Sequence, residues 1–292
     1  MSKLTGIFTA IVTPFKKGEV DYSSFKKLIR AQLDGGIDGI VVNGTTGESP
    51  TLSKEERERL LLFALAEASN QVPIIMGTGT NDTSSSIEQT QIAKKLGAKA
   101  ALVVVPYYNK PPQAGLVGHF TAVAKSADLP IVLYNVPSRT VTSLKAETIV
   151  TLSKVKNIVG IKEATGDLGL TKNIIRKSKK GFFVLSGDDA TYLDLYLSGG
   201  VGAISVLSNM APKQTKSWGE TIKERPKETK KEFVKYKGLI ENLFSESNPI
   251  PIKMALYWMG IIESPELRLP LVELSTENKK KLKSAMKDCG VL

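Results

Sequence analysis

The chain has 292 residues, more than a minimal binding module needs, which allows one large α/β domain or a large domain with a small appendage. Hydrophobic residues make up 41% and charged residues 24%, so a disordered chain without a core is excluded, and no apolar run approaches the roughly 18 residues of a membrane span. Forty basic against 29 acidic residues give a net charge of +11, which raises nucleic acid or an anionic substrate as a partner.

Eight short apolar runs recur along the chain, and most of them end in turn or polar residues. Each is typical of a strand buried on both faces, as the strands of a parallel sheet are. The segments between them are long enough to hold a helix. The runs cover residues 7–12, 39–42, 74–76, 101–105, 131–134, 158–161, 182–185 and 203–206.

The segments between the strands show helical patterns. Apolar residues in 25–33 follow the spacing of one helix face, and Ser53 with Glu56 forms a capping box that opens a helix running to about Ala68. Eight alternations of strand and helix predict a (β/α)8 TIM barrel. A doubly wound sheet is the alternative, but it normally carries a Gly-rich phosphate turn after an early strand, and residues 43–47 read Asn-Gly-Thr-Thr-Gly instead.

The strand pattern stops after Ala211, and the remaining residues read as helices. We predict a catalytic barrel over residues 1–222 and a C-terminal helical region over 223–292. Residues 211–292 hold 16 basic and 11 acidic residues, and the signs alternate along 223–232. Such alternation is typical of a solvated helix face rather than of a nucleic-acid site. Helices are expected at residues 213–223, 227–244, 251–259 and 276–289.

Cysteine and histidine occur once each, as Cys289 and His119. One cysteine forms no internal disulfide, and the two residues are too few for a His/Cys zinc site. The first six residues lack the apolar stretch of a secretory signal, so we expect a cytoplasmic protein. His119 is expected to be a packing or surface residue, and Cys289 lacks a nearby histidine to activate it.

In a barrel, catalytic groups come from the carboxyl ends of the strands and the loops that follow. Lys162 directly continues an apolar strand and alternates with Ile158 and Gly160, so the three are expected to share one face. If that face is the lumen, desolvation favours the free amine, which can attack a carbonyl. Alternatively, Lys162 extends to solvent or pairs with Glu163.

Other strand ends supply groups that suit the same chemistry. Tyr134 stands at the equivalent point of the neighbouring strand, where it can shuttle a proton or merely plug the barrel mouth. The turn at 44–47 offers backbone N–H groups and two hydroxyls to a small carboxylate. Arg139 can bind a second carboxylate through its guanidinium, or simply be solvated. Asp188 and Asp189 lack further oxygen ligands for Mg²⁺ and are expected to act at a helix N-terminus.

The motifs at the strand ends, taken together, resemble the dihydrodipicolinate synthase family, and the resemblance covers nearly the whole chain. It includes residues 248–253 and 267–270 in the C-terminal region. The motifs that carry the resemblance are Gly44-Thr45-Thr46-Gly47-Glu48, Pro106-Tyr107-Tyr108-Asn109, Tyr134-Asn135-Val136-Pro137-Ser138-Arg139-Thr140, Gly160-Ile161-Lys162-Glu163-Ala164-Thr165-Gly166 and Ser186-Gly187-Asp188-Asp189.

The resemblance implies a lyase that condenses pyruvate with L-aspartate 4-semialdehyde by a class I aldolase-type mechanism, in diaminopimelate and lysine biosynthesis, without a metal or organic cofactor. It also implies a homotetramer built from tight dimers. By similarity Lys162 forms the Schiff base and Tyr134 donates and accepts protons. Thr45 and Tyr108 complete a proton relay, with Tyr108 reaching into the active site of a neighbouring subunit. The residues that bind the substrates are Thr46, Gly187, Ile204 and Arg139.

Related families leave two other enzymes open, N-acetylneuraminate lyase and 2-keto-3-deoxy sugar acid aldolase, but the motifs at 44–47 and 137–139 match the synthase pattern.

Lysine-inhibited members of the family carry two histidines where this chain has Lys54 and Arg57, and a glutamate near the position of Ser85. Two cations and a hydroxyl should disfavour the binding of cationic lysine, so we expect weak or absent feedback inhibition. A barrel that binds nucleic acid, or pyridoxal phosphate on Lys162, would be non-aldolase alternatives.

Overall fold

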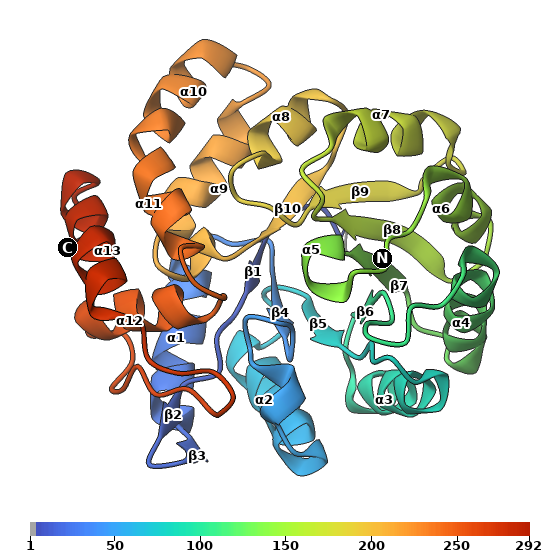
Figure 1. Ribbon diagram of the computed structural model, residues 1–292, viewed down its shortest axis with the longest axis horizontal. Coiled ribbons are helices and arrows are strands. Elements are labelled where there is room, and N and C mark those ends of the chain that lie inside the picture. The colour runs from blue at the N-terminus through green and yellow to red at the C-terminus, as the bar shows by residue number, and fades with distance from the viewer. Residues whose placement is uncertain (1–3) are drawn as a thin grey trace.

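The computed structural model describes residues 4–292 and forms a closed barrel of eight parallel strands (Figure 1). Closure through the pairing of the first strand with the last confirms the TIM barrel and excludes the doubly wound sheet. Around the barrel, β1 is followed by β10, β9, β8, β7, β6, β5 and β4, and β4 pairs with β1 to close the ring. Their bounds are β1 Gly6–Ala10, β4 Gly39–Val42, β5 Ile74–Gly77, β6 Ala100–Val104, β7 Ile131–Asn135, β8 Ile158–Glu163, β9 Phe183–Ser186 and β10 Gly202–Ser205.

Helices surround the barrel, as the alternation predicted. The capping box is confirmed, because the Ser53 side chain accepts from the Glu56 backbone N–H and Glu56 accepts from that of Ser53, which starts α2 at Lys54. A short hairpin, β2 Phe15–Lys16 and β3 Glu19–Val20, was not predicted. The surrounding helices are α1 Tyr22–Asp34, α2 Lys54–Ala68, α3 Thr83–Leu96, α4 Gln113–Ser126, α6 Ala146–Ser153, α7 Leu168–Lys177, α8 Tyr192–Leu197 and α9 Pro212–Thr221.

Three short helical segments lie beside these elements: η1 Ser49–Thr51, α5 Pro137–Thr140 and η2 Leu207–Asn209. Each follows the carboxyl end of a strand by a few residues, namely β4, β7 and β10. They therefore line the barrel end where chemistry is expected.

Two apolar layers hold the barrel together, one between the strands and the helices and one inside the lumen. Glycines make room for the lumen side chains: a Cβ at Gly160 would collide with the ring of Phe183, and one at Gly39 with that of Phe8. Leu102, Tyr134, Leu185 and Ile204 are further lumen residues. The lumen is thus a packed core rather than a pore.

Strand β8 departs from simple alternation. Its register with β7 shifts between Ile131 and Val132, so that Val132 pairs with Gly160 and Tyr134 with Lys162. Val159 packs against the lumen layer, whereas Ile158 packs in the outer one. The expectation that Ile158 shares a face with Gly160 and Lys162 was therefore wrong, because an irregularity in the ladder reverses the sides of the residues before it.

The chain after α9 forms four more helices, α10 Pro226–Lys235, α11 Lys237–Leu243, α12 Ile250–Trp258 and α13 Thr276–Asp288. Figure 1 shows them gathered on one side of the barrel, next to α1 and α9. The single helix expected over 227–244 is two helices that meet at Tyr236, whose ring packs 4.8 Å from that of Trp218 in α9. Helix α9 itself packs on β1 and η2. The boundary at 222/223 follows α9 and stays a prediction.

None of the helices within residues 4–292 combines the length and the apolar character that crossing a bilayer requires.

Candidate functional site

Lys162 and Tyr134 are neighbours inside the barrel. They are register partners on β8 and β7, and the Lys162 Nζ lies 4.3 Å from the centroid of the Tyr134 ring. Lys162 is only 6% exposed, so its amine lies in the lumen rather than in solvent. Within residues 4–292 no carboxylate lies within ion-pair distance of this amine. Solvent exposure is therefore excluded, and the amine stands beside a phenol that can exchange protons with it or with an adduct on it.

Gly187 makes room for the lysine. A Cβ at this position, just after β9, would lie 2.8 Å from Cε and 3.0 Å from Cγ of Lys162. Its backbone N–H donates to the carbonyl of Glu163, which fixes the chain close to the lysine stem. Any other residue at 187 would press on the Lys162 side chain.

Glu163 does not pair with Lys162, so that alternative is wrong. Successive residues of a strand point to opposite sides, and the Glu163 carboxylate accepts from the Asn135 side-chain amide at 3.0 Å and from the Thr165 backbone N–H at 2.7 Å, behind the strand. Burial raises the pKa of the Glu163 carboxyl above its ordinary value. Asn135 also accepts from the Leu144 backbone N–H, so this cluster secures the loop after α5.

A cavity of about 250 Å³ opens at the carboxyl ends of β4 to β7. Thr45 and Arg139, which the sequence assigned to the relay and to substrate binding, both line it. Tyr107 lines it as well, although no role was predicted for that residue. The other lining residues are Ser49, Pro50, Arg57, Gly77, Gly79, Thr80, Gln89, Val104, Val136 and Thr140.

Asn248, which lies just before α12, connects two of the predicted binding residues. Its side-chain amide donates to the Thr46 Oγ1 at 2.9 Å, and its carbonyl accepts from Arg139 at 3.1 Å. Since the Thr46 oxygen already accepts a hydrogen bond, its own O–H is available to donate elsewhere. The structure thus joins Thr46, Arg139 and the C-terminal region through one residue that sequence reasoning had given no role.

Tyr108 and Ile204 stand apart from this cavity. Tyr108 is 88% exposed, with a left-handed backbone (φ 72°), and it does not line the cavity. Ile204 is buried on β10, where it pairs with Phe8. A single chain therefore brings Lys162, Tyr134 and Gly187 together, and Thr45, Thr46 and Arg139 together, but leaves Tyr108 pointing outward.

Asp188 and Asp189 act at local turns. The Asp188 carboxylate accepts from the Thr191 hydroxyl at 2.6 Å, and Asp189 accepts from the backbone N–H groups of Val206 and Leu207, at the start of η2. Among the described residues no three His, Cys, Asp or Glu side chains are grouped as a metal site would need.

The remaining two residues of interest lie outside the site. His119 is buried in α4, where burial lowers its pKa and its Nδ1 lies 3.0 Å from the Thr83 hydroxyl, so it is a packing residue. Cys289 is partly buried, and both burial and Asp288 raise the pKa of its thiol. A raised pKa reduces the thiolate fraction, which agrees with the expectation that Cys289 is no nucleophile.

A buried ion pair beneath the site was missed by sequence reasoning. Lys253 Nζ lies 2.7 Å from the Glu48 Oε1, and both side chains are almost fully buried, at 0% and 1% exposure. Lys253 is the one charged residue in the apolar segment 250–258, and a cation in such a run indicates a buried partner. Glu48 closes the turn that carries Thr45 and Thr46.

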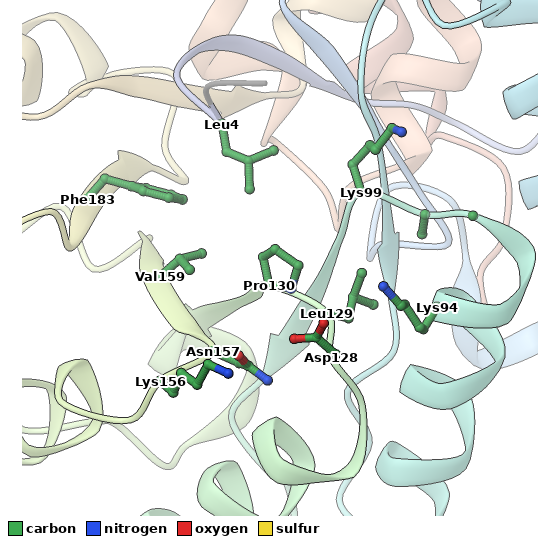
Figure 2. A pocket seen from close by; sticks show the side chains of 12 residues that line it. Leu4, Lys94, Lys99, Asp128, Leu129, Pro130, Lys156, Asn157, Val159 and Phe183 are labelled. Atoms are coloured by element: carbon green, nitrogen blue, oxygen red, sulfur yellow. The ribbon is translucent and has the colours of Figure 1, made fainter. Parts of the chain in front are cut away.

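A larger cavity, of about 900 Å³, lies at the opposite end of the barrel (Figure 2). Its lining comes from the amino ends of the strands and the segments that precede them. The apolar lining residues are Leu4, Ala98, Leu129, Pro130, Val159 and Phe183. The lysines at its edge are exposed and lie on loops or helix ends. The charged lining residues are Lys94, Lys99, Asp128 and Lys156. This lining therefore lacks the buried amine and phenol that stand together at the carboxyl end.

Comparisons with known proteins agree on one family. The model of the Dihydrodipicolinate synthetase family matches residues 3–289. The chain is 52% identical, over the full length of both, to the 4-hydroxy-tetrahydrodipicolinate synthase of Bdellovibrio bacteriovorus. Two solved structures superpose with TM-scores of 0.96: the dihydrodipicolinate synthase of Thermotoga maritima, 42% identical over 99% of both chains, and that of Acinetobacter baumannii complexed with pyruvate, 44% identical over 99% of this chain and 100% of the other. The chain belongs to the Dihydrodipicolinate synthetase family, and it is an enzyme of the lyase type.

Proposed function

We propose that the chain is a 4-hydroxy-tetrahydrodipicolinate synthase that condenses pyruvate with L-aspartate 4-semialdehyde through a Schiff base on Lys162. One observation carries the proposal: the Lys162 amine is buried at the carboxyl end of the barrel, beside Tyr134 and without a carboxylate partner among the described residues. The full-length similarity to proteins of that name supports the same substrates, and no comparison favours sugar-acid cleavage.

The reaction balances without a redox partner. The Lys162 amine adds to C2 of pyruvate, and the former carbonyl oxygen leaves as water to give the imine. Loss of a proton from C3 gives the enamine, whose C3 attacks the aldehyde carbon of the second substrate. The substrate's own amine then attacks C2, closes the ring and releases Lys162. The net reaction thus breaks the carbon–oxygen bond of the pyruvate carbonyl and releases water, which is our basis for proposing a carbon–oxygen lyase.

The residues around Lys162 suit the separate steps. Tyr134 lies where it can protonate the departing oxygen and the alkoxide formed at the aldehyde. Thr46 offers its O–H to the pyruvate carboxylate, with Gly187 leaving room beside the lysine and the Ile204 backbone contributing to the same subsite. Arg139, on the rim of the cavity, binds the carboxylate of the second substrate.

The proton relay requires more than one chain. Thr45 lines the cavity, but Tyr108 is exposed on the same chain, so we propose that Tyr108 completes the relay of a neighbouring subunit. Because Tyr108 is 88% exposed, it is free to reach a second chain, and we propose from the family resemblance an assembly of tight dimers that forms a homotetramer.

Borohydride reduction in the presence of pyruvate, followed by peptide mass analysis, tests the chemistry. We expect an irreversible pyruvate adduct on Lys162 alone, and turnover of aspartate 4-semialdehyde but not of N-acetylneuraminate or 2-keto-3-deoxy sugar acids. An adduct on another lysine, or no adduct, would overturn the mechanism. An adduct with turnover of a sugar acid would keep the Schiff base and overturn the substrate.

A further inference from the structure

Glu48 ends the turn that bears Thr45 and Thr46, and its carboxylate is held on both oxygens. Oε1 accepts from the Lys253 ammonium at 2.7 Å, and Oε2 accepts from the backbone N–H of Arg268 at 3.1 Å. These two donors come from the C-terminal region, more than 200 residues later in the sequence. The carboxylate therefore ties the turn after β4 to a part of the chain outside the strand-and-helix alternation.

The two cations also share an aromatic surface. The Lys253 ammonium lies 4.3 Å, and the Arg268 guanidinium 4.4 Å, from the centroid of the buried Phe15 ring. The Arg268 guanidinium in turn binds both oxygens of Glu56 and the carbonyl of Thr51, in the segment that follows the turn. The positions of Lys253 and Arg268 are thus fixed by several contacts besides Glu48.

Glu48 has a left-handed backbone (φ 54°), a region that a residue other than glycine adopts only when its surroundings hold it there. Its N–H donates to the Thr45 carbonyl at 3.1 Å, and the Thr13 hydroxyl donates to the Gly47 carbonyl at 2.8 Å. A movement of the Glu48 carboxylate would pass directly to Thr45 and Thr46. The anchor and the reacting hydroxyls belong to one hydrogen-bonded turn.

We propose that Lys253 and Arg268 are positioning residues that act through Glu48 to fix the Thr45 and Thr46 hydroxyls at the mouth of the barrel. The inference rests on the proposed function, since it assigns those hydroxyls to the relay and to pyruvate binding. The C-terminal region then has a catalytic purpose: Asn248 orients Thr46 from one side, and Lys253 and Arg268 hold the far end of the same turn.

A purely structural ion pair makes a different prediction. Replacing both members of a buried ion pair by neutral groups of similar size is often neutral or stabilising, whereas removing one partner leaves an unpaired buried charge. The double variant Glu48→Gln/Lys253→Met therefore separates anchoring from folding. If the pair only stabilises the protein, activity per folded molecule stays unchanged in this variant.

The opposite end of the barrel supplies a matched control. The Asp38 carboxylate accepts from the Lys216 ammonium at 2.6 Å and from the Ile7 backbone N–H at 2.7 Å, the same hydrogen-bond pattern as at Glu48. This pair is partly exposed and lies far from the site, and Lys216 also pairs with Glu220. Asp38→Asn/Lys216→Met removes that pair. We expect its kcat/KM to stay within about twofold of wild type, whatever happens to its Tm.

For the Glu48→Gln/Lys253→Met variant we expect kcat/KM with pyruvate to fall by about 10- to 100-fold, as positioning losses do. We also expect faster amide hydrogen exchange over residues 44–49 than in wild type. Should this variant not fold, Glu48→Gln alone keeps the side-chain shape and one acceptor oxygen but loses the second hydrogen bond, because the amide NH2 group only donates. A fall in kcat/KM with the same exchange pattern is expected for this variant as well.

Wild-type values of kcat/KM and of exchange at 44–49 in the folded variant would overturn the proposal, as would an equal loss in the Asp38→Asn/Lys216→Met control. If wild type itself fails to condense the two substrates, the proposed function falls separately, because the exchange rates still report whether Lys253 holds the turn. The two failures are therefore distinguishable.

Discussion

The two ends of the barrel differ both in the size of their cavities and in the burial of their lysines. The amino end holds the larger cavity, about 900 Å³, with lysines that are exposed at its edge. The carboxyl end holds a cavity of about 250 Å³ together with one lysine that is 6% exposed. Burial beside Tyr134, rather than the number of cations, distinguishes Lys162 from the exposed lysines of the amino end. The excess of positive charge is therefore a poor guide to the site.

The largest expected difference is between replacing a lysine at the carboxyl end and replacing one at the amino end of the barrel. Lys162→Met should lower kcat/KM by about 10³-fold or more, because the residue that we propose forms the covalent intermediate is lost. Lys99→Met, at the amino end, should leave kcat/KM within about twofold of wild type, since a solvated surface substitution seldom matters. Steady-state kinetics on both variants, with borohydride trapping, measure the contrast. Comparable losses in the two would contradict the assignment of chemistry to the carboxyl end.

Tyr134→Phe removes the phenol and keeps the ring beside Lys162. We expect kcat to fall by about 10²- to 10³-fold, with the pyruvate adduct still trapped by borohydride but formed more slowly, because proton transfer is impaired while the nucleophile remains. Rapid-quench measurement of adduct formation separates the two steps. An unchanged trapping rate together with unchanged kcat would leave Tyr134 as an aromatic plug only.

Much of this arrangement was predictable from sequence because it is local. Each strand is a short apolar run bounded by polar residues, so its position was found to within about two residues, and the capping box fixed the start of α2. Lys162 stood out because a charged residue rarely continues such a run. These features depend on residues that are neighbours in the chain.

The rest depends on contacts that no local pattern encodes. The shift in β8 passed unnoticed because Ile158 and Val159 are both apolar and suit either side of the strand. Glu48 and Lys253 are separated by 205 positions, so their pairing follows only from the folded barrel. The relay role that we propose for the exposed Tyr108 depends on a second chain.

Arg139→Gln tests the rim of the smaller cavity. We expect KM for aspartate 4-semialdehyde to rise by roughly 10- to 100-fold, the usual effect of losing a hydrogen bond to a charged group, with KM for pyruvate little changed. Since Arg139 also binds the Asn248 carbonyl, Arg139→Lys, which keeps the charge, should recover part of the loss. A rise in KM for pyruvate alone would place Arg139 at the other substrate.

The buried pair at the carboxyl end predicts a pH dependence of stability. Burial lowers the pKa of Lys253 to about 8, against the opposing attraction of Glu48, so the folded protein binds fewer protons than the unfolded chain at higher pH. The free energy of unfolding of wild type, relative to Glu48→Gln/Lys253→Met, should therefore rise between pH 8 and 10, on the order of 1–2 kcal/mol. Denaturant titrations at several pH values measure it, and a flat or falling difference would contradict the burial of a charged amine.

The smallest expected effect is that of added lysine. Lys54, Arg57 and Ser85 line one cavity of about 200 Å³, as their predicted correspondence to a regulatory site requires. Lys54 is paired with Glu88, and Arg57 donates to Gln89 at 2.8 Å. Glu58 also lines the cavity, so Arg57 and the paired Lys54 must outweigh one further carboxylate for a second cation to be repelled. We expect no inhibition by lysine at ~1 mM, a concentration that would reveal a dissociation constant in the millimolar range. The triple variant Lys54→His/Arg57→His/Ser85→Glu replaces repulsion by a carboxylate and should gain sensitivity, because an ammonium group then meets an unpaired anion. Strong inhibition of wild type would show that local charge does not decide whether this cavity accepts lysine.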